Sequence, residues 1–536
     1  MTELQPASEN GAAQFSEGAD AAQAPEKPPS SQRREQRAAL LIEDGDGGGG
    51  SILAQCLCWA AAPPSASEAA PPAARGAALE QRLRRTPVWG AAANTIAFMC
   101  VPRSLPACFA ATGWSLGLGA LAWSSVVTYE TGQLLGTMCA ADAELTSFPA
   151  LGGAAFAKWR AARAAARAEA VDDGARARWR AAGRRATLAM QFATYYLTAV
   201  AELIYFEQYC GQLFARSPLC QWQWLLVVAL VTLPVMQVPS FHESRWAALT
   251  VAVLPMAFNV AVFLYEVLLV RPWSCEPGPT HTPPTASQGF LGLTAFAYAF
   301  GGHGLYPEQI REMADARQWP KVMRLTYGVA LPLYWGCGLL GYAAYGDFAQ
   351  ANINLNFPEN GANVASLWVQ LLQEVYFMLS TNLVMVLAIE IHLGIDPARA
   401  WTPAWRGLPP WAARLLLRTL FLGSQVFVAQ LLLSGEGDTL LSLQSLIGAI
   451  GMTAFTYFLP YAAYLVLAPE PLTRRRTVWC AANVVIGVIV MLAGLYASLA
   501  DLVASSAGLF AGDCRIEYAY SPSSPDDPCY ESGPPL

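Results

Sequence analysis

Long apolar runs recur along the chain between about residues 88 and 503, and each is long enough to cross a membrane. Backbone inside a bilayer must satisfy its own hydrogen bonds, so runs of this kind fold as helices. Only 13% of the 536 residues are charged, whereas a soluble domain carries about 25%. The sequence therefore predicts an all-α membrane protein with about eleven spans. These are 88–111, 116–139, 187–213, 222–240, 246–270, 289–313, 321–345, 364–393, 411–434, 439–468 and 476–503.

The distribution of basic residues predicts the orientation of these spans. With a cytoplasmic N-terminus, 29 of the 33 Lys and Arg residues fall on the cytoplasmic side, in agreement with the positive-inside rule. The chain then divides into a cytoplasmic tail (1–85), a transmembrane domain (86–505) and an extracellular or luminal tail (506–536). The first tail is rich in Ala, Pro, Ser and Gly, a composition typical of disorder. A plasma membrane and a vacuolar or lysosomal membrane both suit this topology.

A basic cytoplasmic loop, residues 140–186, interrupts the transmembrane domain. Trp and Arg recur in it, around Trp159 and again around Trp179. Such a segment either lies as a helix on an anionic leaflet, with lipid as its partner, or forms a solvated linker helix. The sequence leaves these two alternatives open.

Several classes of function find no support in the sequence. The chain has no GxxxxGK[ST] loop for ATP, no HExxH motif and no paired CxxC motifs, and its four histidines are scattered. Nothing points to nucleic acid either. We therefore expect neither an enzyme nor an ATP-driven pump, and no resident metal or cofactor.

The sixth predicted span is interrupted near mid-membrane by Gly301-Gly302-His303-Gly304. Backbone freed at this depth is tolerated only where it is buried in protein or lines a cavity. The first span is interrupted in the same way, because Pro102 and Pro106 disrupt helical hydrogen bonds near its middle.

The two interruptions lie in spans one and six, which are five positions apart in the order of spans. Because five is an odd number, a repeat of five spans is inverted in the membrane. Paired interruptions in two inverted halves are typical of a transporter site. The alternative is two ordinary glycine or proline kinks.

Several motifs carry a resemblance to a known family. They are Ser104-Leu105-Pro106-Ala107 with Gly113-Trp114, Phe296-Ala297-Tyr298-Ala299 with Gly302-His303, Glu308-Gln309-Ile310, Val238-Pro239-Ser240-Phe241, and Gly341-Tyr342 with Tyr345-Gly346. In order and spacing they resemble the amino acid/auxin permeases over about residues 85–505. The resemblance implies a LeuT-like fold, with five plus five inverted spans and one more. It also implies transport of amino acids coupled to protons or sodium.

One departure from the family concerns the substrate site. The family usually has Gly-x-Gly before the Ser-Leu-Pro motif, where bare backbone meets the substrate's charged groups. Here these positions are Met99 and Val101, and Arg103 follows. We therefore expect side chains to crowd the first interruption, while the glycines of the sixth keep their backbone bare.

The candidate substrate-binding residues lie at the two interruptions: Met99, Val101, Arg103, Ser104, Tyr298, Gly301, Gly302 and His303. Arg103 either grips a carboxylate of the substrate or pairs with a buried acid. His303 either relays a proton, since its unperturbed pKa of about 6.5 suits this role, or remains neutral and binds a freed carbonyl.

Candidates for binding the coupling ion lie elsewhere in the spans. Glu130, Glu202 and Glu374 are intramembrane acids, and each is a possible proton carrier or partner of Arg103. Asn94 on the first span and Ser380, Thr381 and Asn382 on the eighth offer neutral oxygens for sodium. The available acids and His303 favour proton coupling.

Together these features predict a secondary transporter of amino acids or related small solutes that works by alternating access. The competing hypothesis is a membrane sensor that binds an amino acid and signals through its cytoplasmic tail without transport.

Overall fold

A computed structural model of the chain describes residues 86–100, 102–214, 217–237, 246, 248–270, 279–358, 360–393, 410–432 and 439–505. Both predicted tails, Val101 and the motif at 238–241 lie outside the described residues. Within these ranges the regular structure is helical, apart from one isolated bridge between Thr86 and Met313. Six described stretches are long and apolar enough to cross a membrane, judged by length and composition. The predicted all-α membrane fold is confirmed.

Each predicted span coincides with a helix or a pair of helices. The α-helices are α4 (Val88–Met99), α5 (Leu105–Ala141), α6 (Phe148–Ala165), α7 (Asp173–Leu213), α8 (Gln221–Val235), α10 (Leu254–Tyr265), α11 (Ala286–Ala299), α12 (Tyr306–Glu312), α13 (Trp319–Tyr345), α14 (Gly361–Leu393), α15 (Pro410–Leu432), α16 (Thr439–Ile447), α17 (Leu459–Leu467) and α18 (Arg474–Ser505). Short π-helices flank α10 and join α16 to α17.

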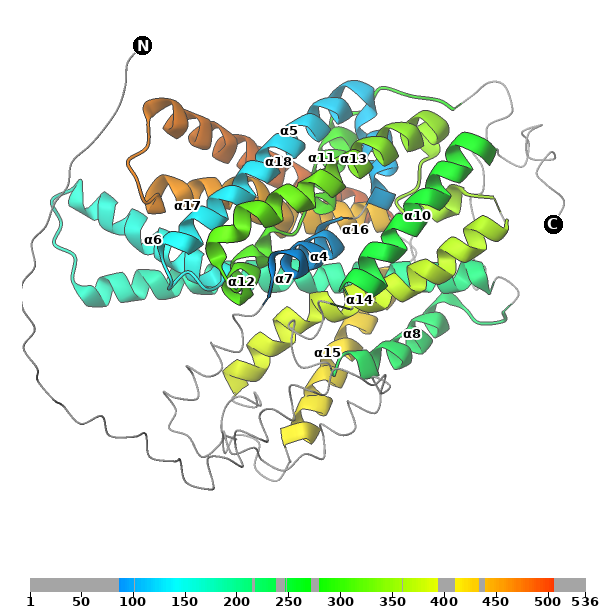
Figure 1. Cartoon of the computed structure of the whole chain (residues 1–536), viewed down its shortest axis with the longest axis horizontal. Coiled ribbons are helices and arrows are strands. Elements are labelled where there is room, and N and C mark those ends of the chain that lie inside the picture. The colour runs from blue at the N-terminus through cyan, green and yellow to red at the C-terminus, as the bar shows by residue number, and fades with distance from the viewer. Residues whose placement is uncertain are drawn as a thin grey trace, which may run out of the picture. The chain divides into compact units, whose positions relative to one another are not determined.

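The two largest apolar cores among the described residues hold most of these helices together. One lies where α5, α11 and α13 run side by side with α4 (Figure 1). The other joins α7 to α8, α14, α15 and α16. Phe296 of α11 belongs to the first core and Tyr298 to the second. The sixth span therefore lies between the two cores.

The first and sixth spans are both broken, as predicted. The first consists of α4, a 3-10 turn at Pro102–Ser104, and the start of α5. The sixth consists of α11, a 3-10 turn at His303–Leu305, and α12. Pro106 lies in the first turn of α5, where the missing N–H of proline costs nothing. It therefore begins a helix, whereas the sequence predicted that it disrupts one.

A sharp bend at Gly113 separates the first span from the second. Gly113 has φ 68° and ψ 178°, inside a helix that is otherwise continuous to Ala141. An added Cβ would lie 3.1 Å from Cδ of Pro284, and the positive φ disfavours any other residue. Glycine at this position therefore allows α5 to turn back into the membrane.

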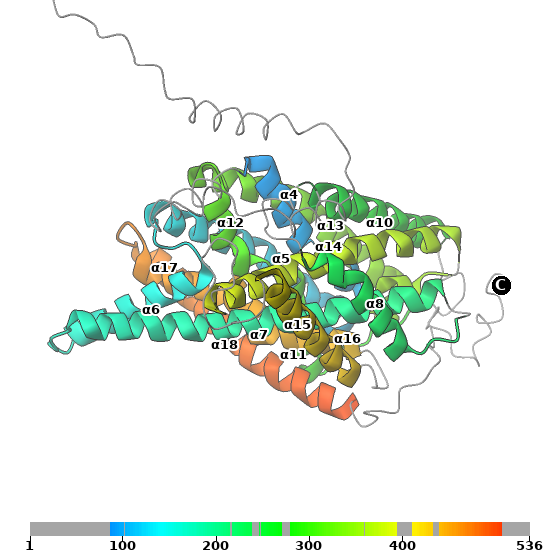
Figure 2. The ribbon, with the colours of Figure 1, turned by 90° about the horizontal axis from the view of Figure 1, so that it is seen from below.

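The basic loop forms a helical hairpin. The 41 residues of α7 extend about 60 Å, roughly twice the thickness of a hydrocarbon core. Its first turns pack against α6 through Gly153 and Gly183, and the pair projects beyond the other helices (Figure 2). The basic loop is thus a pair of packed helices, and its two alternatives, a solvated segment or one on an anionic leaflet, stay predictions. Within the hairpin, Arg160 stacks over Trp179 at 5.1 Å.

Candidate functional site

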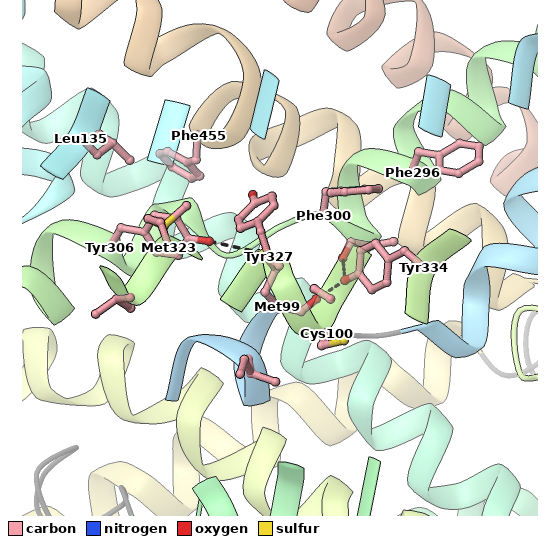
Figure 3. Packing of buried hydrophobic residues seen from close by; sticks show 14 of the residues in the cluster. Met99, Cys100, Leu135, Phe296, Phe300, Tyr306, Met323, Tyr327, Tyr334 and Phe455 are labelled. Carbon is pink, nitrogen blue, oxygen red and sulfur yellow. Dashed lines mark hydrogen bonds between the residues drawn. The ribbon is translucent and has the colours of Figure 1, made fainter. Parts of the chain in front are cut away.

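The two helix breaks meet at Tyr334 of α13. Its hydroxyl oxygen lies 2.5 Å from the carbonyl oxygens of Met99 and Ala299, which are the last residues of α4 and α11. Figure 3 shows Met99 and Phe300 beside this tyrosine, with the Phe300 ring edge-on to it at 4.7 Å. The last carbonyls of a helix lack partners within the helix and carry its negative partial charge. Tyr334 donates a hydrogen bond to these carbonyls and so ties the corresponding ends of two half-helices together.

Side chains from other helices cover the glycines of the sixth break. An added Cβ at Gly301 would lie 2.5 Å from Sδ of Met452, and one at Gly304 would overlap the Tyr195 hydroxyl. Gly302 faces Cβ of Met99 at an ordinary contact distance of 3.4 Å. The backbone expected to be bare is therefore closely packed in this conformation.

Arg103 is the centre of a buried ionic cluster. Arg103 lies within the 3-10 turn of the first break and is 8% exposed. Its guanidinium forms ion pairs with Glu202 of α7, at 3.2 Å, and with Glu374 of α14. Nη1 also donates to the hydroxyl of Tyr209, at 2.9 Å, and to the amide oxygen of Gln370, at 3.3 Å. Of the two roles considered for Arg103, the structure shows the pairing with buried acids, and with two of them.

Aromatic side chains surround the same cluster. The guanidinium carbon lies 3.7 Å from the centre of the Tyr205 ring, a cation–π contact. The hydroxyl of Tyr298, on α11, donates to Oε1 of Glu202 at 3.1 Å. The cluster therefore connects the 3-10 turn at Pro102–Ser104 to α7, α11 and α14, and it links the first broken helix to the sixth.

A small cavity lies beside the first break. Its volume is about 40 Å³, enough for a few water molecules but not for an amino acid. Polar and apolar groups alternate around it: its lining is Cys100, Pro102, Arg103, Met256, Asn259, Val260, Phe263, Cys337, Ile353, Asn354, Phe357, Ser366, Gln370, Gln373 and Phe377. This cavity is thus lined by residues of the first break, including Arg103, and not by the glycines of the sixth break.

His303 is fully buried on the sixth break. Its Nε2 lies 2.8 Å from the carbonyl oxygen of Thr128, and its ring packs on Tyr306 with centroids 4.4 Å apart. A carbonyl only accepts, so Nε2 carries the proton and the ring joins α5 to the sixth span. Among the described residues no acid pairs with it, an arrangement that favours the neutral role.

The other intramembrane acid expected at a coupling site lies elsewhere. Glu130 forms an ion pair with Arg476 and accepts hydrogen bonds from Tyr461 and from Nε1 of Trp479, at 2.7 Å for the latter. It therefore belongs to the contact of α5 with α17 and α18, while Glu202 and Glu374 belong to the Arg103 cluster.

The neutral oxygens proposed for sodium are buried, and those of Asn94, Ser380 and Asn382 have separate hydrogen-bond partners. Asn94 accepts from the Tyr376 hydroxyl at 3.5 Å, and Ser380 bonds back to its own helix. Asn382 accepts from Gln425 at 2.7 Å, and Thr381 is 2% exposed. Ser104 is also buried, and its hydroxyl has no partner within the described part of the chain.

A family comparison agrees with this geometry. The sequence model described as "Transmembrane amino acid transporter protein" matches residues 87–500. The chain belongs to this family. The resemblance seen in the motifs is thereby confirmed.

Individual relatives are more distant. "Amino acid transporter AVT1C" of Arabidopsis thaliana is 23% identical over 214 residues, which are 40% of this chain and 36% of the relative. "Vacuolar amino acid transporter 4" of Saccharomyces cerevisiae is 35% identical over 102 residues, 19% of this chain and 14% of the relative. The match therefore spans well under half the length of either relative.

Solved structures show similarity at low identity. MhsT in complex with L-phenylalanine is 10% identical, with 77% of this chain and 100% of that chain covered and a TM-score of 0.43. A manganese transporter of Eremococcus coleocola is 12% identical, with 78% and 92% covered and a TM-score of 0.44.

Some residues of this family member were not foreseen. Tyr334 is one of several aromatic residues in the span 321–345, and nothing in the sequence distinguishes it as a contact between the two breaks. Arg418, within the predicted span 411–434, is 1% exposed and is held by both oxygens of Glu390, at 2.8 and 3.1 Å. The signal for this pair was available, because both residues fall within apolar spans.

Proposed function

We propose that the chain is a secondary transporter that moves amino acids through the region between its two broken helices, driven by an ion gradient. The observation that carries the proposal is the convergence of two half-helix ends, at Met99 and Ala299, beside the buried Arg103 cluster. Both are C-terminal ends, whose negative partial charge suits the ammonium group of an amino acid, and the Arg103 guanidinium is the nearby cation for its carboxylate. Family membership and the amino acid transporters among its relatives support the same substrate class.

The described conformation is closed, and transport requires it to open. A cavity of about 40 Å³ must widen several-fold to hold an amino acid. Met99 and Met452, which cover Gly302 and Gly301, are unbranched side chains that adopt other rotamers readily. Movement of the α4 and α11 ends away from the helices that cover them would create the binding space.

We further propose an internal membrane such as that of a vacuole or lysosome, with the N-terminus in the cytoplasm. The vacuolar name of the yeast relative supports the location. Cys220, next to the start of α8, is disulfide-bonded. Disulfides persist in oxidising compartments, so this bond supports a non-cytoplasmic position, in our proposal the lumen, for this end of the molecule.

Counterflow in liposomes tests the proposal. Purified protein is reconstituted into vesicles loaded with unlabelled L-glutamine, L-leucine or L-tyrosine, and uptake of the same radiolabelled amino acid is followed. We expect uptake above that of protein-free vesicles for at least one of them. Thermal stabilisation by an amino acid without any counterflow would instead identify a sensor and contradict transport.

A further inference from the structure

We infer that Glu374 is the proton carrier of this protein: the substrate's carboxylate takes over Arg103 from Glu374, and the released Glu374 takes up one proton. The inference rests on the proposed transport function. It adds a specific residue and a fixed ratio of one proton per substrate.

The charges of the cluster are the first argument. One guanidinium holds two carboxylates, and the side chains of Arg103, Glu202 and Glu374 are 7%, 5% and 0% exposed. The other ionisable groups at the cluster are the hydroxyls of Tyr205, Tyr209 and Tyr298. The cluster therefore carries one surplus negative charge at a depth where charge is costly, and a zwitterionic substrate, which adds no net charge, leaves this surplus unchanged. One proton on Glu374 neutralises the surplus while the substrate is bound.

The hydrogen bonds decide which acid is released. Glu202 keeps a donor of its own, because the Tyr298 hydroxyl bonds its Oε1 at 3.1 Å. Glu374 bonds Arg103 through Oε1, and its Oε2 has no donor in the part of the chain that the structure describes. Without Arg103, Glu374 would be a fully buried carboxylate with no compensation. Such a group takes up a proton, whereas Glu202 can remain ionised.

The cavity provides the path for the exchange. Arg103 lines it, and Nε of Arg103 has no acceptor among the described residues, so one donor is available to an incoming carboxylate. Gln370 and Gln373, which both precede Glu374 within about one turn of α14, line the same cavity. A substrate in the widened cavity would therefore meet Arg103 next to the acid that it replaces.

The proton balance over one cycle is complete. The carboxylate of a zwitterionic substrate binds Arg103, and Glu374 takes a proton from the water on the entry side. Glu202 remains ionised and offsets the substrate's ammonium group. On the exit side the substrate leaves, Glu374 releases the proton to the water there, and its carboxylate returns to Arg103. Each cycle moves one substrate and one proton in the same direction.

Three vesicle measurements test the inference, with the membrane potential clamped and the amino acid chosen by the counterflow panel above. Wild-type protein should concentrate the amino acid at most about tenfold per unit of pH difference, as one proton per substrate requires. Glu374→Gln should retain counterflow and lose accumulation driven by the pH difference. Glu130→Gln is the matched control, because it neutralises an acid outside the cluster, and it should retain both.

Separate outcomes contradict the inference and the proposed function. Absence of wild-type counterflow overturns transport itself. Counterflow with pH-driven accumulation that persists in Glu374→Gln overturns the role of Glu374 alone. A pH-indicator dye provides a readout that does not depend on the variant's folding: wild-type protein in detergent should take up about one proton per bound amino acid, and no uptake refutes the exchange.

Discussion

Replacement of Tyr334 by phenylalanine tests whether the two helix breaks are held together by one hydroxyl. The substitution keeps the ring, which packs edge-on against Phe300, and removes only the oxygen that lies 2.5 Å from two buried carbonyls. A hydroxyl has one proton, so it donates to one carbonyl at a time. We therefore expect the free energy of unfolding to fall by about 1–3 kcal/mol, the cost of leaving a buried acceptor without its donor. Because the ring remains in place, no cavity adds to this loss.

The measurement is the free energy of unfolding in detergent, together with the rate of counterflow in vesicles. Tyr345→Phe is the matched control. Tyr345 is on the same helix and fully buried, and its hydroxyl has no hydrogen-bond partner among the described residues. We expect the control to unfold like the wild type. If Tyr334→Phe loses no more stability than the control and transports at the wild-type rate, the hydroxyl does not hold the breaks together.

Three more substitutions test the packing at Gly304 and the buried ion pair of Arg418. Gly304→Ala places a methyl group against the Tyr195 hydroxyl, so we expect a loss of about 1–3 kcal/mol and slower counterflow. Gly328→Ala, which meets nothing within 4 Å, should be as stable as the wild type or slightly more so, and equal effects of the two would refute the packing argument. Glu390→Gln removes the carboxylate that holds the buried Arg418, and thermal unfolding should show a loss of about 3–5 kcal/mol. A loss below about 1 kcal/mol would show that Arg418 is adequately compensated without that charge.

Much of the fold was predictable because its signals are local. Apolar runs of sufficient length become helices in a membrane whatever their neighbours are. The glycines at 301, 302 and 304 mark a break because they weaken a helix where they stand. Pro106 shows the limit of such reasoning. A proline disrupts a helix interior but fits a first turn, and only the observed start of α5 at Leu105 distinguishes the two.

The partners of the intramembrane charges were not predictable in the same way. Glu130, Glu202 and Glu374 were equivalent in sequence as partners of Arg103. Arg103 and Glu374 are 271 positions apart, so their contact depends on how α5, α7 and α14 pack. Likewise, the sequence could not indicate that Met452 covers Gly301.

The sequence by itself determined the class of the protein, its family and the places where two membrane helices break, because length, hydropathy and backbone chemistry act over a few residues. Only the tertiary structure decided what those breaks contain. It placed the Tyr334 hydroxyl on the carbonyls of Met99 and Ala299, and it placed a small cavity beside Arg103. The physical reason is that a buried polar group needs a partner within about 3 Å, and helices far apart in sequence supply it.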